Sequence, residues 1–136
     1  MQVFISHAQA DEPLVGNIST VLKKAGLKVW EANSCLMPGD NLGYEVARAL
    51  EESQAMVVLL TPEALHSPWV KWEIECALSG TRYRNRLIPV LVGDPQQLPE
   101  DDIPWILRRL PQFTVSEHGD NETEIKPIAD AILSHA

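Results

Sequence analysis

The sequence has few cysteines and no long apolar run. Its two cysteines, Cys35 and Cys76, form no CxxC pair and have no histidines beside them at metal-ligand spacing, so neither a disulfide framework nor a metal site is expected. No apolar run approaches the ~20 residues that span a bilayer, and the first residues lack both the charged and the apolar segment of a signal peptide. We therefore expect a cytoplasmic protein with no membrane partner.

Motifs of several common enzyme classes are also missing. The chain contains no GxGxxG after its first apolar run, no GxxxxGK[ST] and no GxSxG, which argues against dinucleotide redox enzymes, P-loop triphosphatases and serine hydrolases. Basic residues are scarce as well, because 11 Lys and Arg are set against 19 Asp and Glu, for a net charge of −8. Nucleic acid is not an expected partner, since phosphate neutralisation needs a basic surface. We interpret the small basic group of Arg82, Arg84 and Arg86 as solvated surface.

What the sequence does contain is short apolar runs that alternate with segments of helical period. A length of 136 residues suits one domain with one core, so we expect residues 1–136 to form a single domain. Strands are predicted at residues 3–5, 27–30, 55–60, 87–92 and 112–115. The run at 55–60 is apolar throughout, which is typical of a strand buried on both faces of a parallel sheet. Pro89 cannot donate to a ladder and predicts an edge, a bulge or a strand end.

The first helix is predicted between the first two strands. Asp11 is its expected cap, Pro13 fits its first turn and Gly26 ends it. Its apolar residues recur at helical spacing and are Leu14, Val15, Ile18, Val21, Leu22 and Ala25.

Further helices are predicted in each later connection. One begins at Asp40 or Asn41, with Val46, Ala47 and Leu50 on its apolar side, and one runs from Pro68 to about Ser79 after a Ser67 cap, following an irregular stretch behind Thr61 and Pro62. A short piece at 103–110 is expected to bring Trp105 and Leu107 to the core. The last helix has Pro127 near its start and an apolar face of Ile125, Ile128, Ala129, Ile132 and Leu133. Strands interleaved with helices predict an α/β fold, a doubly wound five-stranded parallel sheet with helices on both faces.

A ligand site is expected at the carboxyl ends of the strands, as in other doubly wound sheets. The turns after Ile5, Trp30 and Leu60 lie there. Residues 31–40 have no period and contain Pro-Gly, which predicts a long loop of the kind that tends to carry function. His7 lies at the end of the first strand. The remaining histidines are dispersed, and we interpret them as surface or loop residues: His66, His118 and His135.

Trp69 and Glu73 are four residues apart in the helix predicted from residue 68, so they lie on one face of it. An indole can stack on a planar or cationic ring while a neighbouring carboxylate reaches the sugar attached to that ring. The same spacing also arises where a core tryptophan precedes a solvated glutamate. Spacing alone leaves both interpretations open.

Three segments in register resemble those of Toll/interleukin-1 receptor (TIR) domains. Residues 3–8 (VFISHA) resemble the first box of the family, residues 36–40 (LMPGD) the second, and residues 67–74 (SPWVKWEI) the segment that holds the catalytic glutamate. The likeness covers essentially the whole chain and implies a flavodoxin-like three-layer sandwich. The third box of many animal receptors, a Phe-Trp pair, is not evident because no tryptophan follows Phe113, so the chain resembles bacterial members more closely.

The resemblance implies an enzyme that cleaves the nicotinamide–ribose bond of NAD. It makes Glu73 the catalytic residue, and the implied substrate-binding residues are Trp69, Ser6, His7, Leu36, Met37 and Asp40. One carboxylate suffices for this chemistry, because nicotinamide leaves as a neutral base, whereas ordinary glycosidases must also protonate an alkoxide. NAD is then a substrate and no cofactor is expected. Attack by water gives ADP-ribose, and attack from within the same molecule gives a cyclic ADP-ribose.

The resemblance also implies partners and a role. Family members complete their catalytic sites by self-association, so we expect other TIR copies to activate the chain in antiphage immune signalling, with residues 36–40 reaching across or opening on assembly. Either a separate sensor or effector protein supplies the trigger, or these residues belong to a longer protein. The alternative is a non-catalytic adaptor that signals through residues 31–40. Glu73 favours the enzyme, because an adaptor has no chemical need for that carboxylate.

Overall fold

A computed structural model describes residues 2–30, 48–79, 87–93, 98, 103, 105–110, 112–116 and 122–134. Its strands form one sheet in the order β2-β1-β3-β4-β5, and every neighbouring pair is parallel. The strands are β1 (Gln2–Ser6), β2 (Lys28–Trp30), β3 (Ala55–Leu60), β4 (Leu87–Val92) and β5 (Phe113–Val115). The predicted five-stranded parallel sheet is confirmed, and its strand boundaries differ from the predicted ones by a residue or so at most ends.

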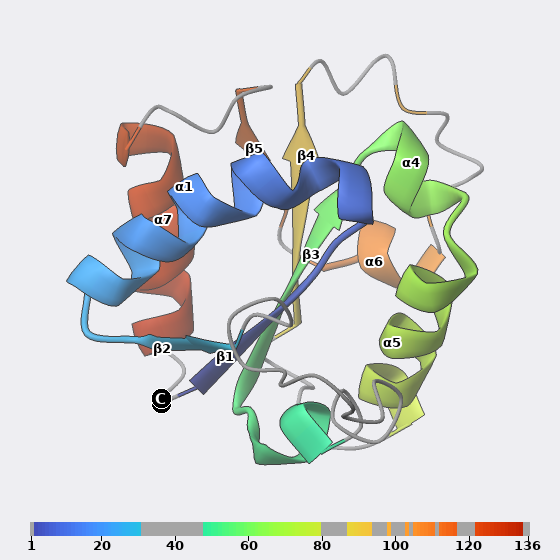
Figure 1. Cartoon of the computed structure of the whole chain (residues 1–136), viewed down its shortest axis with the longest axis horizontal. Coiled ribbons are helices and arrows are strands. Elements are labelled where there is room, and N and C mark those ends of the chain that lie inside the picture. Colours follow the sequence, from blue (N-terminus) through green and yellow to red (C-terminus); the bar gives the residue numbers. More distant parts are fainter. Residues whose placement is uncertain are drawn as a thin grey trace.

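Helices connect the strands and cover both faces of the sheet (Figure 1). They are the short η1 (Gln9–Asp11), α1 (Glu12–Lys24), α4 (Pro62–Leu65), α5 (Pro68–Ser79), α6 (Trp105–Arg108) and α7 (Glu122–Ser134). Residues 48–52 are also helical, and Leu50 is buried there as predicted. Asp40, Asn41, Val46 and Ala47 lie outside the described residues, as does the group Arg82, Arg84 and Arg86.

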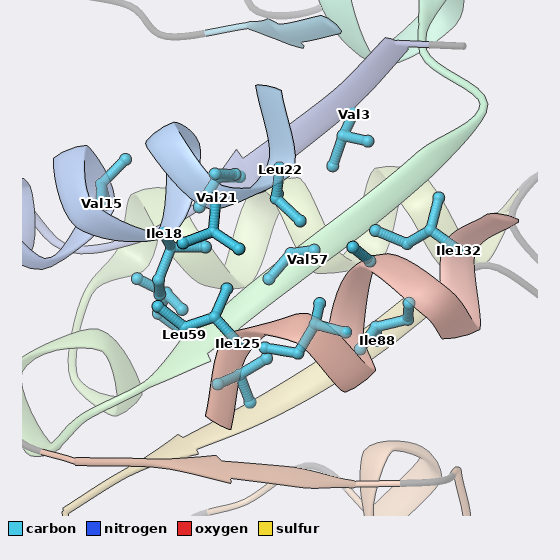
Figure 2. Close-up of a cluster of buried hydrophobic side chains, with 14 of the residues drawn as sticks. Val3, Val15, Ile18, Val21, Leu22, Val57, Leu59, Ile88, Ile125 and Ile132 are labelled. Atoms are coloured by element: carbon cyan, nitrogen blue, oxygen red, sulfur yellow. The ribbon is translucent and has the colours of Figure 1, made fainter. Parts of the chain in front are cut away.

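Two apolar layers sandwich the sheet, because alternate residues of a strand point to opposite faces. One layer packs α1 and α7 onto β1, β3 and β4, and Figure 2 shows its side chains meeting between the helices and the strands. The opposite layer packs α4, α5 and α6 against the other face, with Phe4, Val58, Val70 and Leu107 among its members. β3 is buried along its whole length, as its continuous apolarity predicts. The helices on both faces complete the predicted three-layer α/β fold.

Several local predictions were wrong. Pro89 lies in β4 between β3 and β5 rather than at an edge of the sheet. β5 pairs only with residues 90–92 of β4, so at Pro89 the strand has a hydrogen-bonded neighbour on the β3 side alone. The missing N–H of Pro89 is therefore tolerated. The stretch after Thr61 is not irregular, because the Thr61 side chain accepts a hydrogen bond from the Ala64 N–H and caps α4.

Three apolar residues expected in the core are exposed instead. Trp105 is 62% exposed although Leu107 is fully buried, because residues two apart in a helix point in opposite directions and α6 packs on one side only. Leu133 is 43% exposed and lies in the last turn of α7, one position beyond the buried Ile132. Ala25 is exposed at the end of α1, where Gly26 adopts a φ of 94° and ends the helix as predicted.

Candidate functional site

The candidate site begins with a hydrogen bond between β1 and α5. Ser6 ends β1, is fully buried, and donates from its Oγ to Oε1 of Glu73 over 2.8 Å. Glu73 is only 3% exposed. The interpretation of Glu73 as a solvated helix residue is therefore wrong.

Local sequence explains why α5 directs Glu73 inward. The helix begins after Ser67, whose Oγ accepts a hydrogen bond from the Val70 N–H over 3.3 Å, and Pro68 occupies the first helical position, as predicted. Val70 and Ile74 are buried in the apolar layer beneath the helix. Glu73 is three residues from the first and next to the second, so it lies on the buried face and points toward the end of β1.

Two opposing effects act on the Glu73 carboxyl group. Burial disfavours its charged form, and the hydrogen bond from Ser6 favours it. Burial dominates and raises the pKa of Glu73 to about 8. In the unliganded protein at neutral pH, this carboxyl group is therefore largely protonated. Perturbed carboxyl groups of this kind are concentrated at functional sites.

His7 follows Ser6 and connects β1 to α1. Its Nδ1 lies 3.0 Å from the carbonyl oxygen of Ile5, and its Nε2 lies 2.9 Å from Oε1 of Glu12. The His7 side chain is 12% exposed and the Glu12 side chain 36%. The ring is thus engaged by the protein itself at the carboxyl end of β1.

A second pair connects the turns that follow β1 and β3. Thr61 Oγ1 donates to Oδ2 of Asp11 over 2.7 Å and accepts from the Ala64 N–H over 3.1 Å. Asp11 occupies the N-cap position of α1 but its side chain does not cap that helix, contrary to prediction, because it reaches across to Thr61. Burial is the main reason why the pKa of Asp11 is raised.

Of the residues predicted for the site, the structure brings Ser6 and Glu73 together, and His7 follows Ser6 with its side chain bonded to Ile5 and Glu12. Trp69 lies in the first turn of α5, and its side chain is outside the described part, as are Leu36, Met37 and Asp40 altogether. The sequence did not single out Glu12 or Thr61. Both could have been predicted as site residues, because they are polar residues that follow closely after the carboxyl end of a strand.

An aromatic pair lies on the same face of β1 as Ser6. The rings of Phe4 and Trp30 stack with centroids 5.2 Å apart and planes 12° apart. Trp30 ends β2, and Phe4 precedes Ser6 by two residues, so the stack flanks the Ser6–Glu73 hydrogen bond on the face that α5 covers.

The described residues hold no cluster of three or more histidine, cysteine or carboxylate side chains arranged for a metal ion. Within the same part of the chain, no helix is both long and apolar enough to cross a membrane.

Comparison with known proteins places these features in a family. The family model described as TIR domain matches residues 3–128. The chain is 29% identical over 90 residues to the NAD(+) hydrolase PdTIR of Paracoccus denitrificans, which covers 65% of this chain and 30% of that protein. It is 26% identical over 90 residues to the probable 2′ cyclic ADP-D-ribose synthase TcpO of Methanobrevibacter olleyae, covering 65% of this chain and 26% of that protein.

A solved structure gives the same assignment. The metazoan TIR-STING receptor from C. gigas matches with a TM-score of 0.75 and 26% identity, over 93% of this chain and 38% of that one. The chain thus spans between about a quarter and two fifths of the length of these proteins. Since the family model matches nearly all of its residues, the chain belongs to the TIR domain family.

Proposed function

We propose that this TIR domain cleaves the nicotinamide–ribose bond of NAD, with Glu73 as its catalytic residue. The observation that carries the proposal is the buried carboxyl group of Glu73, held by Ser6 at the carboxyl end of the first strand. Ligands of doubly wound sheets bind at that edge. The similarity to PdTIR and TcpO, named as an NAD hydrolase and a probable cyclic ADP-ribose synthase, supports NAD as the substrate.

The charge of NAD suits the resting state of Glu73. The nicotinamide ring is a cation, and a cation brought within a few ångströms of a carboxyl group favours its ionised form. Substrate binding would thus convert the protonated Glu73 into a carboxylate beside the ribose. That negative charge then stabilises the oxocarbenium-like ribose as the bond to nicotinamide lengthens.

The proposed reaction balances without a second carboxyl group. The C1′–N1 bond breaks, its electron pair returns to the ring nitrogen, and nicotinamide leaves as a neutral base. Water attacks C1′ and releases a proton, which returns the Glu73 carboxylate to its protonated form. Together with the proton that Glu73 gave to solvent on substrate binding, NAD and water thus give nicotinamide, ADP-ribose and one proton. If a nitrogen or hydroxyl of the same molecule attacks instead, the product is a cyclic ADP-ribose, and exclusion of water favours that outcome.

The remaining substrate contacts and the partners belong to the same proposal. Trp69 stacks on a ring of NAD, the backbone at Ser6 and His7 lines the entrance, and Leu36, Met37 and Asp40 complete the site. Self-association with other TIR domains activates the enzyme in the cytoplasm, in antiphage immune signalling, with a separate sensor or effector as a further partner. A dilute monomer should then turn over little NAD.

Incubation with NAD tests the proposal directly. Concentrated protein is mixed with NAD and free nicotinamide is measured by chromatography for the wild type, Glu73→Gln and Glu75→Gln. Glu75 is a matched control, because it is exposed on the same helix two residues away. We expect Glu73→Gln to lower the rate by about 100-fold or more and Glu75→Gln to leave it unchanged. Equal release by all three proteins would remove Glu73 from the mechanism.

The alternative is a non-catalytic TIR adaptor. One observation favours it, because a carboxyl group that is 3% exposed and already bonded to Ser6 also fits a purely structural pair. An adaptor would release no nicotinamide at any concentration, and Glu73→Gln would retain self-association. Light scattering of both proteins beside the nicotinamide assay separates the two functions.

A further inference from the structure

Both ring nitrogens of His7 face hydrogen-bond acceptors. The carbonyl oxygen of Ile5, 3.0 Å from Nδ1, carries no hydrogen, and neither does an ionised Glu12 carboxylate, 2.9 Å from Nε2. A neutral imidazole has one N–H and can satisfy one of these partners only. The imidazolium form has two and can satisfy both. Through these two contacts the ring joins the end of β1 to the start of α1.

Carboxyl groups surround the contact between His7 and Glu12. Glu12, from the first turn of α1, bonds the ring directly, and Asp11, from η1, also attracts it electrostatically. Asp11 in turn faces Glu63 of α4. The described acidic groups around this contact are therefore Asp11, Glu12 and Glu63.

The two contacts of His7 enclose Ser6. The contact between Nδ1 of His7 and the Ile5 carbonyl joins the two residues that flank Ser6. The contact between Nε2 and Glu12 fixes the ring to the start of α1. Ser6 is the residue whose hydroxyl reaches Glu73. We propose that His7, held between Ile5 and Glu12 by its two ring nitrogens, is a positioning residue that directs the Ser6 hydroxyl at Glu73.

His7 would act on Glu73 through Ser6 and would take no proton from a substrate. The hydrogen bond from Ser6 lowers the pKa of Glu73, so a misplaced Ser6 leaves the carboxyl group harder to ionise. The importance of this contact for catalysis rests on the proposed function. The contact itself is testable without any substrate.

Nuclear magnetic resonance can follow both His7 and Glu73, the two residues that the proposal connects. The ¹⁵N shifts of His7 report whether each ring nitrogen carries a proton, and the ¹³Cδ shift of Glu73 followed against pH gives the midpoint of its ionisation. We expect the ¹⁵N shifts to show that both ring nitrogens of His7 are hydrogen-bonded. We expect Ser6→Ala to raise the Glu73 midpoint and His7→Ala to raise it toward the same value. Adding His7→Ala to Ser6→Ala should produce no further shift, since both act through one hydrogen bond.

Glu12 variants distinguish the positioning role of His7 from a direct effect of the His7 and Glu12 charges on the pKa of Glu73. In Glu12→Gln the side-chain amide can donate to an unprotonated Nε2, so a neutral ring keeps both contacts and the Glu73 midpoint should stay at its wild-type value. The double variant His7→Ala, Glu12→Gln likewise has no net charge at these two positions, but it lacks the contacts of the His7 ring. The midpoint of Glu73 ionisation should therefore rise. His66→Ala, an exposed histidine at the end of α4, is the control and should change nothing.

Several results would overturn the proposal. They are a His7 ring nitrogen without a hydrogen bond in the wild type, a Glu73 midpoint that His7→Ala leaves in place, or a midpoint that Ser6→Ala leaves in place. If His7→Ala does not fold, Glu12→Ala removes the same contact from the α1 side and should raise the midpoint. Nicotinamide release is measured in parallel: without release the proposed function fails while the midpoints still decide the role of His7.

Discussion

Ser6 and Glu73 are 67 residues apart in the chain, and a 2.8 Å hydrogen bond joins them at the end of β1. The serine places a donor on a carboxyl group that is otherwise enclosed by the layer beneath α5. Each side chain therefore depends on the other, since the carboxyl group accepts the buried hydroxyl and the hydroxyl offsets part of the burial of the acid. The proposed chemistry uses this balance, because the group stays protonated until a cation approaches.

The rate of NAD cleavage should rise with pH between 6 and 8. The pKa of Glu73 in the free protein is about 8, above its ordinary value, so the fraction of ionised carboxylate grows through this range. For kcat/KM, which reports the free enzyme, we expect a roughly tenfold gain per pH unit at the acid end and a plateau above about pH 8. The measurement is initial nicotinamide release at low NAD, with an enzyme-free blank at each pH. A flat or falling profile would show that the ionised group is not the active form.

Removal of the Ser6 hydroxyl should move that profile toward higher pH. Ser6→Ala deletes the hydrogen bond that lowers the pKa of Glu73, so ionisation requires a more alkaline solution. Each unit of displacement lowers activity at pH 7 by about tenfold. Ser6→Thr retains a hydroxyl and should stay nearer to the wild type. Loss of activity at every pH alike would instead indicate that Ser6 contacts the substrate.

Periodicity predicted the frame of this site well. The strands and α5 follow from apolar runs and caps, and burial of β3 follows from its unbroken apolarity. The position of Glu73 relative to Ser6 did not follow, because sequence spacing carries no information about which face of a helix meets the end of a distant strand. Resemblance to a family supplied that connection, and the structure supplied its geometry.

Interactions that cross between turns were beyond sequence reasoning for the same reason. Asp11 was expected to cap its own helix, and the local pattern supports that expectation. Tertiary structure gave it a different partner, since β1 and β3 are neighbours and their following turns meet. The predicted burial of Trp105 was wrong for a different reason. A helix of one turn buries one side only, and its sequence does not indicate which side that is.

Thr61 should be a stability determinant. Its hydroxyl both donates to Asp11 and caps α4, so Thr61→Val removes a buried hydrogen bond and a cap while retaining the shape of the side chain. We expect the free energy of unfolding to fall by about 1 to 3 kcal/mol. Thr61→Ser keeps both hydrogen bonds and should lose less than half of that amount. Urea unfolding followed by circular dichroism provides the comparison, and equal losses in the two variants would contradict the role of the hydroxyl.

Ser19 offers a stabilising substitution. Its side chain in α1 is 2% exposed, and its hydroxyl has no hydrogen-bond partner among the described residues. A buried hydroxyl without a partner is destabilising, so Ser19→Ala should raise the free energy of unfolding by about 1 kcal/mol. The neighbouring Thr20 is the control, because its exposed hydroxyl bonds to the Gly16 carbonyl and Thr20→Ala should change stability by less than about 0.5 kcal/mol. A destabilised Ser19→Ala protein would mean that this hydroxyl has a partner in solution.

Glu73 should make the wild type less stable as the pH rises. Its pKa is about 8 in the folded protein and near 4.5 when unfolded, so between these values the folded state holds the extra proton and the free energy of unfolding falls with increasing pH. The full difference corresponds to about 5 kcal/mol at 1.36 kcal/mol per pKa unit, reached above pH 8.

Glu73→Gln stays neutral, and its carbonyl oxygen still accepts the Ser6 hydrogen bond. We therefore expect Glu73→Gln to match the wild type near pH 4.5 and to exceed its stability by several kcal/mol at pH 9, whereas Glu75→Gln follows the wild type throughout. Urea unfolding at pH 4.5, 7 and 9 measures this, and parallel curves for the wild type and Glu73→Gln would mean that Glu73 ionises in the folded protein as easily as in water. A gain in stability together with a loss of nicotinamide release would show that the chain retains this carboxyl group for its chemistry and not for its fold.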